Sequence, residues 1–179
     1  MTAVFGLDLS LTATGIAAPR GVHVVRSAGR ADASLDERHE RLIDLRARIT
    51  DVLRDANAAA GDLVVVEGPS LGSTGGQQWD RAGLWWLLQD RLRQLGYAVA
   101  QVPPSVLKKY ATGRGGADKG AMADAAARRI PGVITHGENN AVDALWLRAM
   151  GCEHLGRPLA KLPADQTAVL AKVAWPVTS

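Results

Sequence analysis

The chain has 179 residues, of which 47% are hydrophobic and 22% charged, and its formal net charge is +3. This length and composition suit one globular domain with a sizeable core and exclude a disordered or fibrous protein. No run of about 18 apolar residues is present, so we expect no membrane span. The N-terminus lacks the pattern of a secretory signal, and Cys152 is the only cysteine, so we expect a cytoplasmic protein without disulfides.

Three short β-prone segments open the chain, separated by turn-forming residues, at 3–9, 12–18 and 22–27. This spacing predicts an antiparallel meander. A long amphipathic helix is expected next, because apolar residues recur with three-four spacing. Ser34 and Glu37 form a capping box at its start, and Gly61 is expected to end it.

The middle of the chain alternates between strands and helices. The apolar run DLVVVEGPS predicts a strand that is buried on both faces and ends at Glu67. A loop rich in Gly, Ser and Thr leads to a helix near 77–95, and YAVAQV predicts another strand. A short helix and a glycine-rich loop follow, then helices near 119–130 and 139–150, the last of which Gly151 should terminate.

This order of elements predicts a mixed α/β sheet with helices on both faces. We assign residues 1–152 to one domain and 153–179 to a C-terminal tail, with at most one short helix, that packs on the domain or extends from it. If the fourth strand pairs beside the first, Asp8 and Glu67 lie side by side near the centre of the sheet.

Three acidic residues occupy unusual places in this pattern. Asp8 lies in an apolar strand, where a lone carboxylate costs several kcal/mol unless a cation meets it, and Gly6 leaves room beside it. Glu67 ends a buried strand, while Asn140 and Asp143 lie three residues apart on one helix face. Two carboxylates about 4 Å apart repel by about 4 kcal/mol at an effective dielectric near 20, so converging acids need a counter-charge.

The types of ligand favour a hard cation. The candidates offer only oxygen, and the histidine and cysteine spacings of zinc sites are missing. The acids therefore predict a site for Mg²⁺ or Mn²⁺, with two ions on either side of a scissile phosphate. Taken singly, each acid has an ordinary alternative: Asp8 as a structural acid bonded by Ser10 or Thr12, and Glu67 or Asp143 as a solvated residue.

A basic segment concentrates the positive charge. Between residues 105 and 130, six basic residues outnumber two acidic ones, a surplus of four that exceeds the net charge of the chain. Such a patch fits a polyanion, although a solvated helix face and a flexible loop have the same composition. In TGRGGADK the glycines permit close approach to a phosphate, while Arg114 and Lys119 supply charge. The order of a nucleotide-binding P-loop is absent.

Four segments resemble motifs of the RuvC-type Holliday-junction resolvases, members of the ribonuclease-H-like nuclease superfamily. GLDLSLTATGIA resembles the first motif, VVVEGP the second, PPSVLKKYATGRGGADKGAM the basic segment and NNAVDALWLR the last motif. Together they cover about residues 3–150 in the family's order. The resemblance implies a five-stranded mixed sheet of order 3-2-1-4-5, with its first three strands antiparallel, and a nuclease domain over residues 1–152.

The same resemblance implies a homodimeric, Mg²⁺-dependent endonuclease that nicks four-way or other branched DNA in a bacterial or phage-infected cell. By position, metal ligands would be Asp8, Glu67 and Asp143. Contacts to phosphates or to the transition state would come from Lys108, Lys109 and Lys119.

Position 140 departs from the family's pattern, because Asn140 stands where Asp is usual. An amide is a neutral and weaker ligand, so we expect the second metal to bind less tightly there. We keep Asn140 as a metal-binding candidate, with Glu138 as an alternative on a different part of the helix. On this interpretation Asn140→Asp keeps or raises activity.

Further DNA contacts are expected from Ser10 and Thr12 after the first strand and from Arg114. Trp79 and Leu71 flank the loop after the second acid, where a wedge residue would stack on bases or split them. Two more tryptophans lie in the same apolar helix, and we expect them in the core or at a homodimer interface: Trp85 and Trp86.

Other functions fit parts of the sequence. GLDLSLTATG is also similar to the phosphate loop of actin-like and sugar-kinase-like ATPases, although those enzymes clamp nucleotide between two lobes and need a longer chain. A junction-binding protein that lost its chemistry through position 140 would keep the fold. A related nuclease would act on structured RNA or on other branched DNA.

Overall fold

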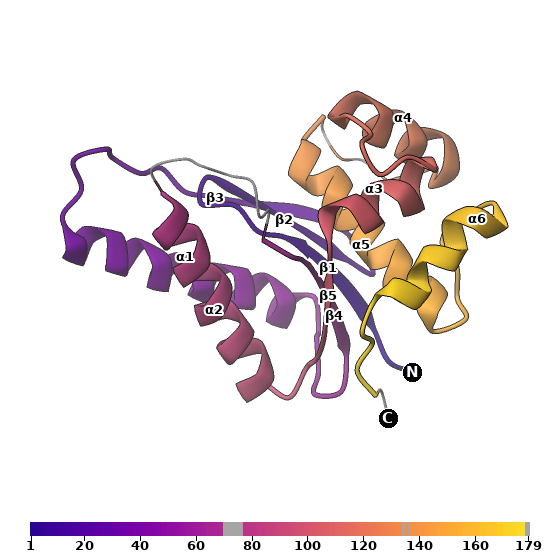
Figure 1. The fold of residues 1–179 in the computed structure, drawn as a ribbon. Coiled ribbons are helices and arrows are strands. Elements are labelled where there is room, and N and C mark those ends of the chain that lie inside the picture. Colours follow the sequence, from indigo (N-terminus) through magenta and orange to yellow (C-terminus); the bar gives the residue numbers. More distant parts are fainter. Residues whose placement is uncertain (70–76, 134, 136, 178–179) are drawn as a thin grey trace.

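The structure is a computed structural model that describes residues 1–69, 77–133, 135 and 137–177. In these residues five strands form one mixed sheet of order β3-β2-β1-β4-β5 (Figure 1). Their bounds are β1 Val4–Asp8, β2 Ala13–Ala18, β3 Gly21–Arg26, β4 Leu63–Glu67 and β5 Ala98–Val102. Strands β1, β2 and β3 pair antiparallel, while β4 pairs parallel to both β1 and β5. The predicted strand order and the predicted pairing of the fourth strand beside the first are confirmed.

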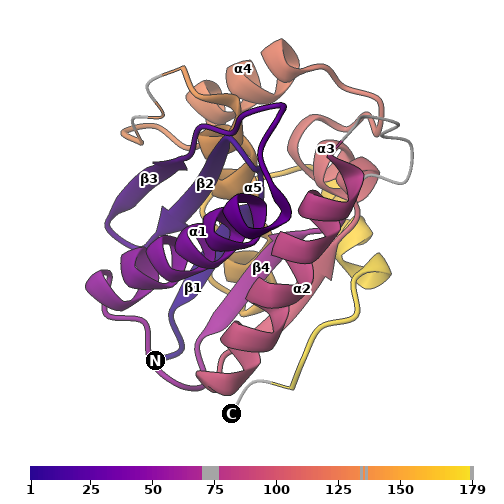
Figure 2. The same cartoon turned by 90° about the vertical axis from the view of Figure 1, so that its left-hand side faces the viewer.

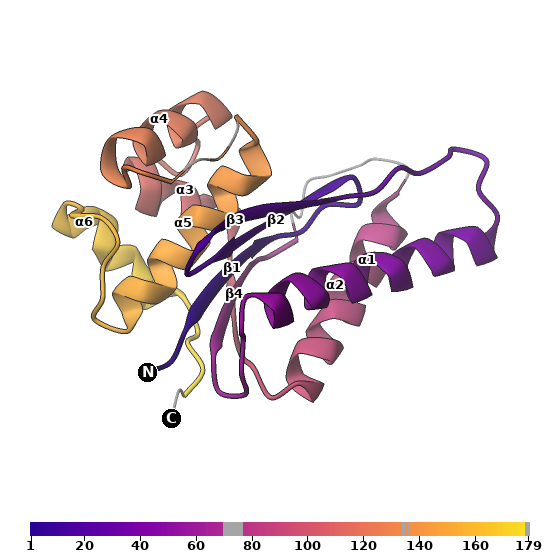
Figure 3. The same cartoon turned by 180° about the vertical axis from the view of Figure 1, so that it is seen from behind.

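Helices cover both faces of the sheet, as the sequence predicts. On one face α1 and α2 lie side by side, and on the other α5 lies against the sheet with α3, α4 and α6 beyond it (Figures 1, 2 and 3). The bounds are α1 Leu35–Asp55, α2 Gln78–Gln94, α3 Pro104–Thr112, α4 Lys119–Arg129, α5 Asn139–His154 and α6 Ala164–Thr167. A 3₁₀ segment, η1, spans Ala168–Lys172. No helix in the described ranges is long and apolar enough to cross a membrane.

Helix α1 begins as predicted and ends earlier than predicted. The hydroxyl of Ser34 accepts from the backbone N–H of Glu37, whose carboxylate accepts from the N–H of Ser34, so the capping box is confirmed. The predicted end at Gly61 is wrong, because the helix stops at Asp55. Asn57 then adopts a left-handed conformation with φ 61°, which Asn tolerates and which turns the chain out of the helix.

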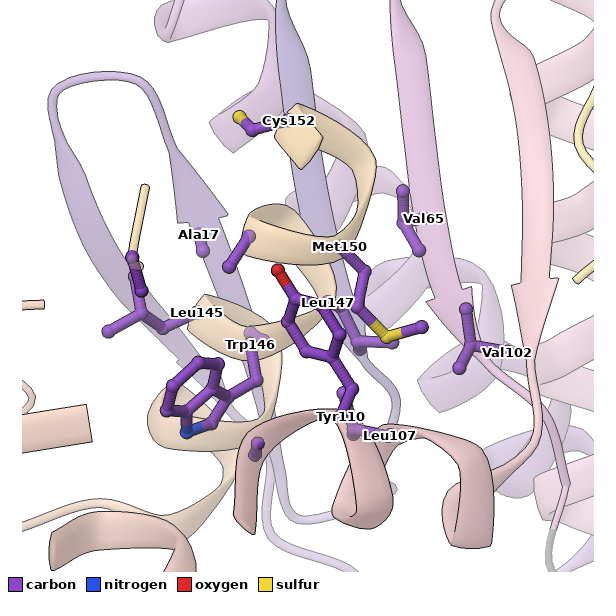
Figure 4. Close-up of a cluster of buried hydrophobic side chains, with 14 of the residues drawn as sticks. Ala17, Val65, Val102, Leu107, Tyr110, Leu145, Trp146, Leu147, Met150 and Cys152 are labelled. Carbon is purple, nitrogen blue, oxygen red and sulfur yellow. The ribbon is translucent and has the colours of Figure 1, made fainter. Parts of the chain in front are cut away.

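The core consists of two apolar clusters, one on each face of the sheet. Alternate residues of the central strands divide between them, so Phe5 and Leu7 pack toward α1 and α2, while Val4 packs toward α5. Figure 4 shows the α5 side, where Trp146 and Tyr110 fill the space between α5 and α3. The same alternation places Asp8 on the α5 face, two residues beyond Gly6.

Helix α5 lies so close to β1 and β2 that backbone touches backbone. A Cβ added at Gly6 would lie 2.0 Å from the carbonyl oxygen of Ala144, and one at Gly15 would lie 1.9 Å from that of Asn140. From the helix side, a Cβ at Gly151 would lie 2.6 Å from a methyl group of Val4. The prediction that Gly151 ends the helix is therefore wrong. This glycine allows close packing on the sheet, and α5 continues to His154.

The C-terminal tail folds back onto α5 and α3. Its one-turn helix α6 runs directly into η1, and Val169 and Val173 are buried in the α5-side core. The indole of Trp175 stacks on the ring of His154, with centroids 4.2 Å apart and planes 8° apart. The indole N–H of Trp175 also donates to the carbonyl of Leu170 at 3.0 Å.

Candidate active site

Asp8 and Glu67 end two neighbouring parallel strands. Leu7 lies opposite Val66 in the β1–β4 register, so the acids that follow them lie at the same edge of the sheet. Because β4 also alternates, Glu67 lies on the α5 face, as Asp8 does. Asp8 is only 8% exposed, and the two carboxyl groups lie within hydrogen-bonding range of each other.

Asp143 approaches this pair from the first turns of α5, and burial disfavours the charge on all three acids. Burial raises the pKa of Asp8 well above its ordinary value, and the negative charges of Glu67 and Asp143 raise it further. Burial is also the main reason that the pKa values of Glu67 and Asp143 are raised. Without an added cation, the three carboxylates therefore resist ionising together.

Two lysines partly offset the acidic charge. The positive charge of Lys119 lowers the pKa values of Asp8 and Asp143, against the effect of burial. Lys108 acts in the same direction on Glu67 and Asp143. Within the described ranges neither lysine forms an ion pair with the acids.

The donor chemistry of this site fits a hard divalent cation, since its three acids offer only carboxylate oxygens. In the part of the chain that the structure describes, no three His, Cys, Asp or Glu side chains already stand together closely enough to hold a metal ion. Asp8 and Glu67 approach each other closely instead, as expected for two buried carboxyl groups that share a proton. The structure thus brings the predicted acids to one place without closing a ligand shell around a cation.

The two residues considered as extra metal ligands make other contacts. The side-chain amide of Asn140 donates through Nδ2 to the backbone carbonyl of Ala13, at the start of β2. The carboxylate of Glu138 pairs with the guanidinium of Arg26 on β3. Glu138 is therefore engaged at the rim of the sheet.

The turn after Asp8 is held by its own hydroxyl groups. The hydroxyls of Ser10 and Thr12 lie 3.2 Å apart, and Thr14 donates to the carbonyl of Ser10 at 2.8 Å. No hydrogen bond joins Asp8 to Ser10 or Thr12 in the described residues, so the structure does not support Asp8 as an acid bonded by this turn. Ser10 and Glu67 both line a cavity that is described below.

The predicted DNA-contacting cations lie on α3, at the start of α4 and in the loop between them. Lys109, Arg114 and Lys119 are exposed, and Lys108 is half-buried nearer the acids. Gly113 ends α3 with φ 82°, and the Thr112 hydroxyl accepts from the N–H of Arg114 at 3.2 Å, which shapes the loop. Asp118 caps α4 by accepting from the N–H of Ala121 at 2.8 Å, so Lys119 stands at the first helical position.

The tryptophans of α2 are more exposed than core residues. Trp79 is 83% and Trp86 is 68% exposed, and Trp86 meets Trp85 edge-on with ring centroids 4.8 Å apart. A core position is thus wrong for Trp86, because it lies on the face of α2 that turns away from the sheet. The other residue considered as a wedge, Leu71, lies outside the described residues.

A cavity of about 340 Å³ opens beside Glu67, between the turn after β1 and the first turns of α2. Its walls are mainly apolar, with Leu9, Leu84 and Trp85 among them, and α2 adds Gln78 and Arg81. Sequence reasoning did not single out Arg81. Its signal was present, because Arg81 is a basic residue near the start of the helix that follows Glu67 in the sequence.

Comparisons with known proteins show what fold carries this site. No family model matches the chain, and no curated protein matches it in sequence. Among solved structures, that of Thermus thermophilus RuvC is 20% identical with a TM-score of 0.59, over 87% of this chain and 98% of that one. T. thermophilus RuvC in complex with Holliday junction substrate is 19% identical with a TM-score of 0.63, over 90% and 99%.

The sheet order, the helix packed across it and the acids at the strand ends define a ribonuclease-H-like fold. Within that class, the chain has the fold of the RuvC structures over most of its length. The fold that the sequence motifs implied is confirmed.

Proposed function

We propose that this protein is a divalent-metal-dependent endonuclease that nicks four-way or other branched DNA by hydrolysis. The observation that carries the proposal is the buried Asp8–Glu67 pair facing Asp143 on a RuvC-like fold, where burial and the neighbouring acids raise the pKa of Asp8. Such an activity belongs to DNA recombination and repair, in the cytoplasm of a bacterial or phage-infected cell.

Each residue of the site has a role in this proposal. Asp8, Glu67 and Asp143 would hold Mg²⁺, or Mn²⁺ in its place, with a second ion held more weakly. The bound cation supplies activation of water and stabilisation of the leaving oxygen. Lys119 stands where its charge also reaches Asp8 and Asp143, so it would stabilise the charge that develops on the phosphate.

The surface around the site suits a polyanion. Lys108, Lys109, Arg114 and Lys119 lie on α3, the following loop and α4, and would neutralise phosphates. The polar turn that contains Ser10 and Thr12 would contact the sugar-phosphate backbone of the DNA beside Asp8. Four such cations predict affinity for DNA that falls steeply as salt rises.

A homodimer through α2 completes the proposal. Trp86 is 68% exposed on α2 and meets the half-buried Trp85 edge-on, and exposed aromatic side chains of this kind are enriched at protein interfaces. Two copies would give two catalytic sites, one for each of two strands of a four-way junction. Sedimentation of the parent and of Trp86→Ser tests this part.

One gel tests the activity. Synthetic four-way, three-way and linear DNA are incubated with and without Mg²⁺ or Mn²⁺, and we expect metal-dependent nicks in branched DNA. Asp8→Asn should abolish nicking and keep junction affinity, since it removes an acid without touching the basic patch. Asp32→Asn is the matched control, because it makes the same substitution at an exposed site and should cut like the parent. An Asp8→Asn variant that cuts at the parent rate would show that the site is misplaced.

The same gel tests two other candidate functions. The amide at position 140 favours a junction-binding protein with weak or no chemistry, and such a protein would shift four-way DNA on a native gel without cutting it. A nuclease for structured RNA would cut a hairpin RNA in preference to the four-way DNA.

A further inference from the structure

The first turn of α5 is fixed to the sheet through its main chain and through one side chain. The main-chain carbonyl of Asn140 lies over Gly15, where any Cβ would collide with it. The side-chain Nδ2 of the same asparagine donates to the carbonyl of Ala13. Gly15 is the register partner of Asp8 in the β1–β2 pair. Asn140 thus joins the helix that carries Asp143 to the strand that pairs with Asp8.

We infer that Asn140 is a positioning residue, whose amide sets where Asp143 stands relative to Asp8, rather than a metal ligand that has lost its charge. The inference rests on the proposed function, because it concerns how the acids are presented to a cation. It explains why this position carries an amide. A backbone carbonyl only accepts hydrogen bonds, and an ionised carboxylate has no proton to donate.

An aspartate at position 140 would therefore oppose the packing of α5. Its oxygens would face the carbonyl of Ala13, so a hydrogen bond at a half-buried position would be replaced by repulsion between two acceptors. The nearby Arg26–Glu138 pair cannot compensate. Its side chains are 61% and 33% exposed, and exposed ion pairs contribute little to stability.

The same contact limits the acidic charge of the site. Glu138 is paired with Arg26, and Asn140 is neutral, so α5 contributes one carboxylate, that of Asp143, to the acids described above. Asp143 follows Asn140 by three residues, less than one helical turn, so a shift of the first turn moves its carboxylate directly. Residues that orient a metal ligand typically change metal affinity 10- to 100-fold when they are replaced.

The chain offers a matched control in the neighbouring asparagine. Asn140→Asp and Asn139→Asp add the same charge to the same helix start, and the structure gives no comparable bond from Asn139 to the sheet. We expect Asn140→Asp to melt about 2–8 °C below Asn139→Asp, a shift that corresponds to about 1–2 kcal/mol in a chain of this size. In Mn²⁺ titrations followed by electron paramagnetic resonance, its affinity should be about tenfold weaker than that of Asn139→Asp.

Two results would overturn the inference. If Asn140→Asp binds Mn²⁺ more tightly than Asn139→Asp, or binds an additional ion, then position 140 is a ligand position. If it melts lower but binds Mn²⁺ as Asn139→Asp does, the amide stabilises the fold without positioning Asp143. A parent chain that binds no Mn²⁺ would instead overturn the proposed function, and this failure is distinct from the other two.

A measurement on the parent protein covers the case in which Asn140→Asp does not fold. In ¹⁵N spectra, one of the two Nδ2 protons of Asn140 should exchange slowly with solvent, and it should remain protected when Mg²⁺ is added. Nδ2 protons that exchange as fast as those of a free amide would show that the bond to Ala13 is absent and would overturn the inference.

Discussion

Replacing Gly15 with Ala should push α5 off the sheet at the point where Asp8 and Asp143 meet. The added Cβ would lie 1.9 Å from the carbonyl oxygen of Asn140, whereas ordinary contact begins at 3.4 Å. The shortfall is 1.5 Å, and the obstacle is backbone, so the helix itself must move. Overpacking of a well-packed core costs about 1–3 kcal/mol and occasionally more, and a rigid obstacle places Gly15→Ala at the upper end. The expected loss is therefore about 3 kcal/mol.

Urea unfolding followed by circular dichroism measures this loss, and metal binding measures its effect on the site. At about 2–4 °C for each kcal/mol, the melting temperature should fall by about 6–12 °C. The same displacement should weaken Mn²⁺ binding, because it moves Asp143 away from the strand acids. Gly116→Ala is the control, since a Cβ at Gly116 meets nothing within 4 Å, and it should change stability by less than about 0.5 kcal/mol. A Gly15→Ala variant as stable as this control would refute the close packing of α5 on β2.

Three other predictions concern charged and exposed side chains in the site and on the helices that pack on the sheet. The hydrogen bonds from Arg38 hold the pKa of Asp80 below its ordinary value, so they stabilise the folded chain at neutral pH and lose that effect as pH falls through the lowered pKa. Asp80→Asn should therefore cost about 1 kcal/mol in urea unfolding at pH 7 and much less in acid, and an equal loss at both pH values would contradict the assignment. The raised pKa of Asp8 has the opposite sign, since its ionisation destabilises the metal-free fold once pH exceeds the unfolded pKa. Asp8→Asn should thus melt at a higher temperature than the parent in EDTA at pH 7, and Mg²⁺ should raise its melting temperature less. A melting temperature below that of the parent in EDTA would contradict the raised pKa of Asp8. Trp79→Ala should impair the opening of a four-way junction, monitored with a fluorescent base analogue, and leave affinity for linear duplex unchanged; an unaltered opening signal would remove Trp79 as a wedge.

The face on which Asp8 lies was predictable because strands alternate with a period of two. The alternation around Asp8 places it on one face with Val4 and Gly6, Glu67 ends its strand, and a meander followed by parallel strands allows few topologies. Those facts suffice to place both carboxyl groups at one edge of the sheet.

Features that depend on contacts between distant segments were not predictable. Gly151 has the local signature of a helix end, yet it lies inside α5. A glycine is required there because a Cβ would collide with the side chains of Val4 and Val65. The end of α1 depends on the left-handed turn at Asn57, and local propensity ranks that residue below the later glycine. The bond from Asn140 to Ala13 joins residues 127 positions apart, so no spacing rule could reveal it.

The stacking of Trp175 on His154 affects where the chain can be truncated for experiments. Arg157 donates to the carbonyl of Thr2 at 2.5 Å, so the segment after α5 also contacts the residues that precede β1. A fragment that stops after Cys152 would lose both attachments and leave the residues beneath Val169 open to water. Residues 153–177 thus fasten the outer side of α5, the helix that carries Asp143, and a nuclease fragment for experiments should keep them.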